Sequence, residues 1–388
     1  MEDWRAGGFG LYLHWPFCQS KCPYCDFNSH VAQAVDQRQW LQAYRNEIAR
    51  LAAETSGRVL NTVFFGGGTP SLMDPDLVAS VIDAIRSSWP MANDPEITLE
   101  ANPGSVEAGR FAAYRQAGVT RVSMGVQALN DADLRRLGRL HTADEAMRAF
   151  EIARGVFERV SFDLIYARQD QTLDDWRAEL RRALAMAVDH LSLYQLTVEA
   201  GTPFADRLAR GGLRGLPDEN RAADLYDATQ DICSAHGMAS YEVSNHARPG
   251  AESRHNLIYW RGGDYVGIGP GAHGRLTLGG RRWATECPKS PATWLAAALR
   301  GDPAEKPRQA LTGPDHAAEY LLMSLRLTEG TDLRRLELLA GTPPLPSTVD
   351  DLTSLGLLEA DPTHLRATAA GRLVLNALIS KLAADLPE

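Results

Sequence analysis

The sequence predicts an α/β protein built on a parallel sheet. Over the first half of the chain, short β-rich runs alternate with longer amphipathic segments of helical periodicity. Strands that alternate with helices pair in parallel through right-handed crossovers. Glycine and polar residues recur where these strands end, and ligands of parallel sheets gather at that edge. Six such units fit an incomplete barrel or a doubly wound open sheet, and periodicity alone allows either.

Six strands are expected in order along the chain, at 9–14, 59–65, 96–101, 121–127, 160–166 and 190–196. The clearest helices between them are 39–53, where Trp40, Tyr44, Ile48 and Leu51 recur at helical spacing, and 76–87. After the sixth strand, 203–235 is expected to be helical, with a break at the glycine pair 211–212.

Composition and charge restrict the class of protein. The 388 residues are 44% apolar and 23% charged, which is ordinary for a globular protein of one large or two unequal domains. The net charge of -9 argues against a nucleic-acid partner. The sequence shows neither a signal-peptide pattern nor an apolar run that could cross a bilayer, so we expect a cytoplasmic protein. An odd number of cysteines agrees with a reducing compartment.

Three of the five cysteines, Cys18, Cys22 and Cys25, fall within eight residues directly after the first strand. Chance clustering explains this poorly, whereas Cys233 and Cys287 stand alone and are expected to be ordinary thiols. A structural zinc site takes four ligands, usually as two separated pairs, and no fourth cysteine or histidine has a comparable spacing. Three thiolates on a four-iron cluster leave one iron open to an outside ligand. The spacing therefore favours an iron-sulfur cluster with a reactive iron.

The longer string from Tyr12 to Cys25, Tyr-x-His-x-Pro-Phe-Cys-x-x-x-Cys-x-Tyr-Cys, resembles the signature of the radical S-adenosylmethionine (SAM) superfamily. Within it, the string is similar to the HemN/HemW family of oxygen-independent coproporphyrinogen III oxidases and their relatives. The resemblance implies an incomplete (β/α)6 TIM-like barrel in which Cys18, Cys22 and Cys25 bind a [4Fe-4S] cluster. It also implies that SAM binds the open iron and is cleaved to methionine and a 5′-deoxyadenosyl radical, with an electron donor such as flavodoxin or ferredoxin.

Polar and glycine residues at the strand ends are candidates for SAM contacts. The run Gly66-Gly-Gly-Thr-Pro70 follows the second strand, and its missing side chains let backbone amides approach a ligand closely. Charged or amide groups in buried strands cost free energy unless they have partners, which are a cofactor or other side chains. Asp163 suits a ribose hydroxyl and Arg139 a carboxylate. The set implied by the resemblance is Tyr12, Tyr24, Gly67, Gly68, Thr69, Glu100, Gln127, Arg139 and Asp163.

One loop departs from the family pattern. Relatives commonly read Asp-Leu-Ile-Tyr-Gly-Leu-Pro-Gly-Gln after the fifth strand, whereas this chain reads Asp163-Leu-Ile-Tyr-Ala-Arg-Gln-Asp-Gln171. The turn loses its glycines and proline and gains Arg168 and Asp170. We therefore do not assign to residues 167–170 the conformation or the contacts that this loop has in the relatives.

A second motif, His255-Asn256-Leu-Ile-Tyr259-Trp260, precedes a glycine-rich stretch at 262–271. A lone histidine in such a loop is more often a hydrogen-bonded structural residue than a ligand. The string His-Asn-x-x-Tyr-Trp resembles the segment that marks the heme-chaperone (HemW) branch of the family. A neutral imidazole can ligate heme iron, and aromatic rings can pack on a macrocycle. The resemblance therefore implies heme contacts at His255, Asn256, Tyr259 and Trp260.

The character of the chain changes near residue 301. Pro303, Pro307 and Pro314 suggest a linker, followed by an apolar helix at 320–327, a short hairpin and a helix at 369–384. This order resembles a small winged-helix-like α+β domain, the C-terminal domain of the same family. Residues 305–388 hold eight Lys or Arg and twelve Asp or Glu, a net of 8 - 12 = -4, so we expect a lid or partner-docking role rather than DNA binding. We divide the chain into a radical SAM domain with the heme motif at 1–300 and a HemN-like domain at 301–388.

Two functions fit these motifs. One is a heme chaperone that binds heme and a SAM-liganded cluster and delivers heme to an acceptor, for example a membrane respiratory enzyme. The other is an oxygen-independent coproporphyrinogen III oxidase of porphyrin biosynthesis. As the resemblance goes, the oxidases carry a fourth cysteine two residues after the third and an N-terminal extension. Here that position is Phe27 and 17 residues precede Cys18, so we expect the chaperone, with no assigned catalytic residue.

Overall fold

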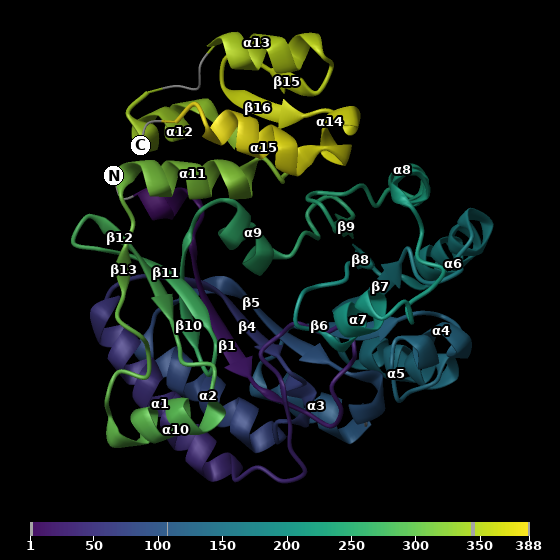
Figure 1. Ribbon diagram of the computed structural model, residues 1–388. Coiled ribbons are helices and arrows are strands. Elements are labelled where there is room, and N and C mark those ends of the chain that lie inside the picture. Colours follow the sequence, from purple (N-terminus) through teal and green to yellow (C-terminus); the bar gives the residue numbers. More distant parts are fainter. Residues whose placement is uncertain (1–2, 107, 343–345, 387–388) are drawn as a thin grey trace.

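The computed structural model describes residues 3–106, 108–342 and 346–386, and its main element is an eleven-stranded sheet. Six parallel strands form the centre of this sheet and follow one another in chain order (Figure 1). A doubly wound sheet reverses its strand order at a switch point, and this order does not reverse. The expected incomplete barrel is therefore confirmed. Its strands are β1 (Phe9–Trp15), β4 (Leu60–Gly67), β5 (Met91–Ala101), β6 (Arg121–Gln127), β7 (Arg159–Tyr166) and β8 (His190–Gln195).

Helices connect the six strands. Trp40, Tyr44, Ile48 and Leu51 of the first helix are buried, as their spacing predicts. Thr142 and Thr172 begin two later helices with capping boxes, which fix where those helices start. The helices are α1 (Gln37–Glu54), α2 (Pro75–Ser88), α3 (Ala108–Ala117), α4 (Asp131–Arg136), α5 (Ala143–Val156) and α6 (Leu173–Met186), and α7 (Pro203–Ala209) and α8 (Glu219–Ala235) follow β8.

Both edges of the barrel sheet are extended by strands that the sequence analysis missed. The expected glycine-rich loop contains β10 (Asp264–Ile268), which pairs in parallel with β1. A Cβ at Gly267 would lie 2.1 Å from the backbone oxygen of His273, so this glycine allows close approach of the next strand. That strand is β11 (His273–Leu278), followed by β12 (Arg281–Glu286) and β13 (Gln309–Ala310), while β9 (Asn245–Ala247) extends the other edge and α10 (Pro291–Arg300) lies between β12 and β13.

The C-terminal region has its own apolar core, which includes Leu321, Leu336, Leu358 and Leu378. Pro314 was expected in a linker, but it lies in the first turn of a helix, where its missing N–H costs nothing. This helix begins at Gly313 and ends at Ser324, earlier than expected at both ends. The elements are α11 (Gly313–Ser324), β14 (Thr331–Asp332), α12 (Leu333–Ala340), α13 (Pro346–Ser354), β15 (Leu358–Ala360), β16 (His364–Ala367), α14 (Ala369–Leu373) and α15 (Leu375–Ala383), with a three-stranded antiparallel sheet.

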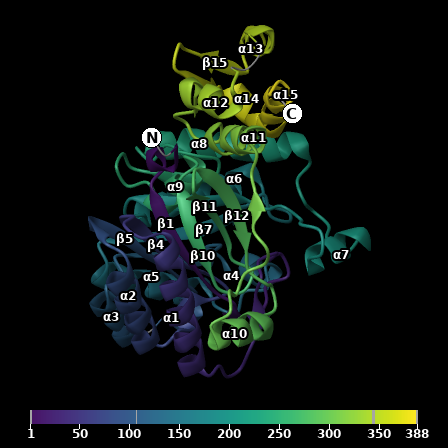
Figure 2. The ribbon, with the colours of Figure 1, turned by 90° about the vertical axis from the view of Figure 1, so that its left-hand side faces the viewer.

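This C-terminal region lies against the amino-terminal end of the barrel, as Figures 1 and 2 show. Arg335 pairs with Asp3 at 2.6 Å, and Glu329 pairs with Arg261 at 2.7 Å. Its first helix, α11, contacts α9 (Arg254–Trp260), which carries the second sequence motif. Of the two expected roles, a lid or partner docking, this placement does not fit a lid over the carboxyl ends of the strands, because these ends face away from the C-terminal region.

The loop that departs from the family pattern keeps a glycine-like backbone. Ala167 has φ 60° and Asp170 has φ 58°, in the left-handed region that glycine favours. We expect Ala167→Gly to stabilise the protein by about 0.5 kcal/mol, because relief of strain outweighs the loss of one buried methyl group, and Ala167→Val to destabilise it by about 2 kcal/mol. Ala149→Gly, at a similarly buried helical position of α5, should instead be destabilising. Urea denaturation measures the free energy of unfolding of all three variants. Equal effects of Ala167→Gly and Ala149→Gly would contradict backbone strain at Ala167.

Candidate functional site

The carboxyl ends of the parallel strands surround a cavity of about 360 Å³. This size falls in the range of small-molecule sites. All but one of the residues predicted to bind the cluster or SAM line it, although they come from six different segments of the chain. They are Cys18, Cys22, Cys25, Tyr24, Gly67, Gly68, Thr69, Glu100, Gln127, Arg139 and Asp163.

The three cysteines lie on one loop that is closed at its base. Strand β2 (Phe17–Cys18) pairs in parallel with β3 (His30–Val31), and within the loop Cys25 N donates to Cys22 O at 3.1 Å. Thr69 Oγ1 donates to Cys18 Sγ at 3.4 Å. Burial raises the pKa of the Cys18 and Cys25 thiols. In the described parts of the chain, no three His, Cys, Asp or Glu side chains are grouped so that they could hold a single metal ion.

The glycine run after β4 is a tight junction rather than a flexible turn. Gly68 N donates to Trp15 O at 2.7 Å and Thr69 N donates to Phe17 O at 2.9 Å, which fastens the run to the cysteine loop. A Cβ at Gly68 would lie 2.7 Å from Phe17 O, and one at Gly67, where φ is 111°, would lie 2.6 Å from the His14 ring. Only glycine therefore fits at either position.

Two carboxyl groups face the cavity, Glu100 from β5 and Asp163 from β7. Burial, reinforced by repulsion from Asp163, raises the pKa of Glu100 to about 8, although Gly67 N donates to its Oε2 at 3.2 Å. Burial also raises the pKa of Asp163 to about 6, against hydrogen bonds from Ser192 and Ser123. Cationic groups of a ligand, such as an ammonium or a sulfonium, would favour the ionised carboxylates.

Two polar atoms in the cavity wall lack partners. Gln127 Oε1 and Arg139 Nε are buried without a hydrogen bond. The remaining nitrogens of Arg139 are engaged, since Nη1 donates to Cys22 Sγ at 3.4 Å and Nη2 donates to Gly125 O at 2.8 Å. Buried polar atoms usually have partners, so these two indicate a polar ligand. The residues present thus fit an iron-sulfur cluster with SAM beside it.

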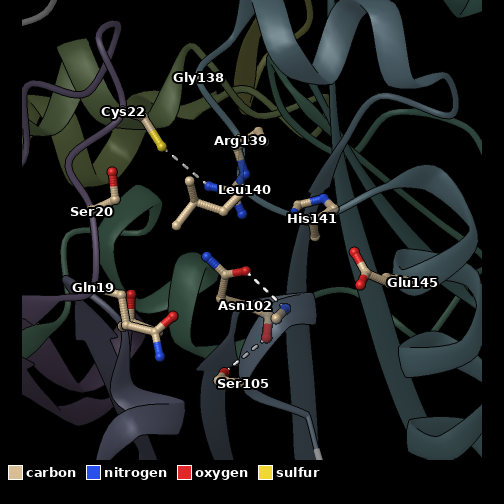
Figure 3. Close-up of a pocket in the computed structure, with 12 residues that line it drawn as sticks. Gln19, Ser20, Cys22, Asn102, Ser105, Gly138, Arg139, Leu140, His141 and Glu145 are labelled. Atoms are coloured by element: carbon tan, nitrogen blue, oxygen red, sulfur yellow. Dashed lines mark hydrogen bonds between the residues drawn. The ribbon is translucent and has the colours of Figure 1, made fainter.

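A side cavity of about 240 Å³ opens next to Cys22 and Arg139 (Figure 3). His141 lies in its wall, and its Nε2 bonds to Val126 O at 3.1 Å while Nδ1 has no partner. Burial, together with the nearby Arg139, lowers the pKa of His141 to about 4, so the ring is neutral. His141 and Asn102, which also lines the cavity, are not among the residues predicted from the sequence. Asn102 lies two residues after Glu100 and His141 lies two residues after Arg139, and this spacing is the sequence signal that could have identified them.

Tyr12 was predicted with the SAM contacts, but it lines an adjoining cavity of about 260 Å³ inside the barrel. Its hydroxyl bonds to His14 Nδ1 at 2.9 Å, and its ring stacks on Phe64. Glu100 and Asp163 line both cavities, so the two spaces adjoin at these carboxyl groups.

The four residues predicted to contact heme lie on α9, at the opposite end of the strands from the cysteine loop. His255 is 1% exposed and lies on this helix, not in the expected loop. Its Nδ1 bonds to Thr62 Oγ1 at 2.6 Å and its Nε2 to Tyr259 Oη at 2.7 Å. Burial lowers its pKa to about 3. Asn256 and Tyr259 line the inner cavity with His255, whereas Trp260 is partly exposed.

Among residues 3–106, 108–342 and 346–386, no helix is both long enough and apolar enough to cross a bilayer.

Comparison with known proteins places this site in a family. The radical SAM superfamily matches at residues 12–183, and the HemN C-terminal domain matches at 311–374. The chain is 38% identical to the heme chaperone HemW of Escherichia coli, over 97% of this chain and 98% of that protein. It is 40% identical to the heme chaperone HemW of Mycobacterium tuberculosis, over 96% and 94%, and 37% identical to the mouse mitochondrial radical S-adenosyl methionine domain-containing protein 1, over 97% and 88%.

The fold is similar to that of the Escherichia coli coproporphyrinogen III oxidase HemN, a radical SAM enzyme. The TM-score is 0.80 at 23% identity, over 98% of this chain and 91% of that chain. The alignments with the two HemW proteins cover nearly all of both chains, and the two family matches are to the radical SAM superfamily and the HemN C-terminal domain. The chain belongs to the HemN/HemW family of the radical SAM superfamily, whose membership implies a [4Fe-4S] cluster and SAM as cofactors.

Proposed function

We propose that this protein is a heme chaperone that binds heme and a SAM-liganded [4Fe-4S] cluster and delivers heme to an acceptor protein. The observation that carries the proposal is the 38% identity to a heme chaperone over nearly the full length of both chains. Phe27 supports it, because the oxidase pattern has a fourth cysteine at this position. We also propose that the protein acts in the cytoplasm and has two domains, with the expected boundary at 300/301 moved to just after β13 (Gln309–Ala310), because this strand pairs with β12 of the barrel sheet.

The cavity residues have distinct roles in this proposal. Cys18, Cys22 and Cys25 would hold the cluster, which supplies the electron that cleaves SAM. Gly67 and Gly68 would let backbone groups meet the methionine end of SAM, and Arg139 would pair with its carboxylate. The two cavity acids, Glu100 and Asp163, would pair with cationic and hydroxyl groups of the same molecule. Tyr24, Thr69 and Gln127 complete the proposed contacts.

Heme is proposed to bind at α9 through His255, Asn256, Tyr259 and Trp260. The imidazole of His255 is neutral, as an iron ligand must be. Its Nε2 reaches iron only when the bond to Tyr259 Oη is broken, so binding requires a local rearrangement of α9. The partly exposed Trp260 offers an aromatic face at the surface.

Two assays on one anaerobic, cluster-loaded preparation test the function. Heme titration should show tight binding, and incubation with coproporphyrinogen III, SAM and a reductant should yield no protoporphyrinogen IX. Decarboxylation without heme binding would assign the protein to the oxidases, the alternative that the fold similarity to HemN favours.

Three variants test the heme site. His255→Ala should weaken heme binding, whereas Tyr259→Phe should retain or strengthen it because the competing hydrogen bond is lost. His236→Ala changes an exposed histidine directly after α8 and should have no effect. Unaltered heme affinity in folded His255→Ala protein would show that this residue does not bind heme. The chaperone function would then still be tested by the heme titration of the wild type.

A further inference from the structure

The loop after β7 carries a buried arginine that none of the proposed roles uses. Arg168 is 3% exposed. Its Nη1 donates to Ile165 O at 2.5 Å, and its Nη2 pairs with Asp133 Oδ2 at 2.9 Å and with Glu179 Oε2. The side chains of Asp133 and Glu179 are partly buried, at 16% and 9% exposed, so the guanidinium is fixed in place and its removal would leave two carboxylates without their cation.

These contacts join the loop to α4 and α6. Asp133 is on α4, and Glu179 on α6 also accepts from Leu129 N at 2.7 Å, just before α4 begins. At the end of α4, Arg136 Nη1 donates to Gln169 O at 2.9 Å. Helix α4 has six residues, a length that is unstable without tertiary contacts. The loop after β7 therefore holds the middle and the end of α4, at Asp133 and Arg136.

The chain leaving α4 covers the cysteine loop directly. Gly138 packs so closely on this loop that a Cβ would lie 2.5 Å from Pro23 Cδ. The next residue, Arg139, donates to Cys22 Sγ and to Gly125 O. The position of α4 thus determines where the Arg139 guanidinium lies relative to Cys22.

We infer that Arg168 is a positioning residue for the cluster and SAM pocket: it fixes α4 and thereby holds Arg139 against Cys22. The inference rests on the proposed cluster and SAM binding. It also gives a physical role to the departure from the family pattern, since the positive φ angles of Ala167 and Asp170 bracket the buried Arg168.

The test compares Arg168→Leu with the triple variant Arg168→Leu/Asp133→Asn/Glu179→Gln. The triple variant removes the arginine and both of its carboxylate partners together and so keeps the inference testable if the single variant does not fold. In cluster-free protein, backbone hydrogen exchange of residues 137–141 should be faster in both. In cluster-loaded protein, SAM should bind about tenfold more weakly, and the reduction potential of the cluster should fall because a positive charge moves away from it.

Matched measurements separate this role from general destabilisation. Arg154→Leu removes an exposed arginine that pairs with Glu151 on α5, and it should change none of the three readouts. Heme affinity should be unchanged in all variants. If the wild type did not bind heme, this would count against the proposed function and not against the role of Arg168. Unchanged exchange at 137–141 in folded variants, or weaker SAM binding with an unchanged cluster potential, would overturn the inference.

Discussion

We expect Cys22→Ser protein, reconstituted anaerobically, to hold on the order of a tenth of the wild-type cluster or less, because a four-iron cluster on two thiolates is poorly retained. Wild-type protein should carry about four iron and four sulfide per chain. Iron and sulfide analysis measures this, together with the electron paramagnetic resonance spectrum of the reduced cluster. SAM should perturb that spectrum in the wild type, because the open iron is the site where it binds.

Cys287→Ser is the matched control. Cys287 directly follows β12 and is 3% exposed, and its Sγ donates to Gly267 O of β10. It does not line the cavity of the three cysteines. This variant should assemble a full cluster and respond to SAM like the wild type. Stoichiometric zinc in the native protein, or equal cluster loss in both variants, would show that Cys18, Cys22 and Cys25 do not together bind one iron-sulfur cluster.

The barrel was predictable because its signal is local and repeated. Each of the six parallel strands is a short β-rich run followed by a helical pattern, and β6 was predicted with its observed bounds. Among the extending strands, β10 and β11 were not found because their glycines read as loop, and β9 and β13, of three and two residues, are too short to show a periodic pattern. The side chain of Asp264 in β10 is fully buried, yet it pairs with Arg58 and Arg282 from distant segments, which no local pattern reveals.

The cavity was predictable from the rule that ligands gather where parallel strands end. Gly67, Glu100 and Gln127 all stand at strand ends, and all line it. Tyr12 does not, because it stands at the fourth of seven positions in β1 and its side chain therefore lies deeper in the barrel. The burial of His255 was also beyond sequence reasoning, since its partner Thr62 comes from β4 and this contact depends on how α9 packs on that strand.

The second large effect is expected at Glu100, where stability and cofactor binding oppose each other. Its pKa is about 8 in the folded, cofactor-free protein against 4.5 for a free glutamate. Between these values the unfolded chain loses the proton and the folded protein keeps it, so the free energy of unfolding falls as pH rises from 4.5 to 8. Glu100→Gln removes this penalty. We expect the variant to be more stable than the wild type by about 2 kcal/mol at pH 8, with little difference at pH 5.

The same variant should bind SAM at least about tenfold more weakly, because a neutral amide cannot pair with a cationic group of the cofactor. Urea denaturation of cofactor-free protein at the two pH values and calorimetric titration of cluster-loaded protein with SAM measure the two effects. Glu151→Gln, an exposed change on α5, should alter neither. If Glu100→Gln kept the wild-type dependence of stability on pH, Glu100 would be ionised in the folded protein. If SAM affinity were unchanged, the carboxylate would belong to the barrel alone and not to the cofactor site.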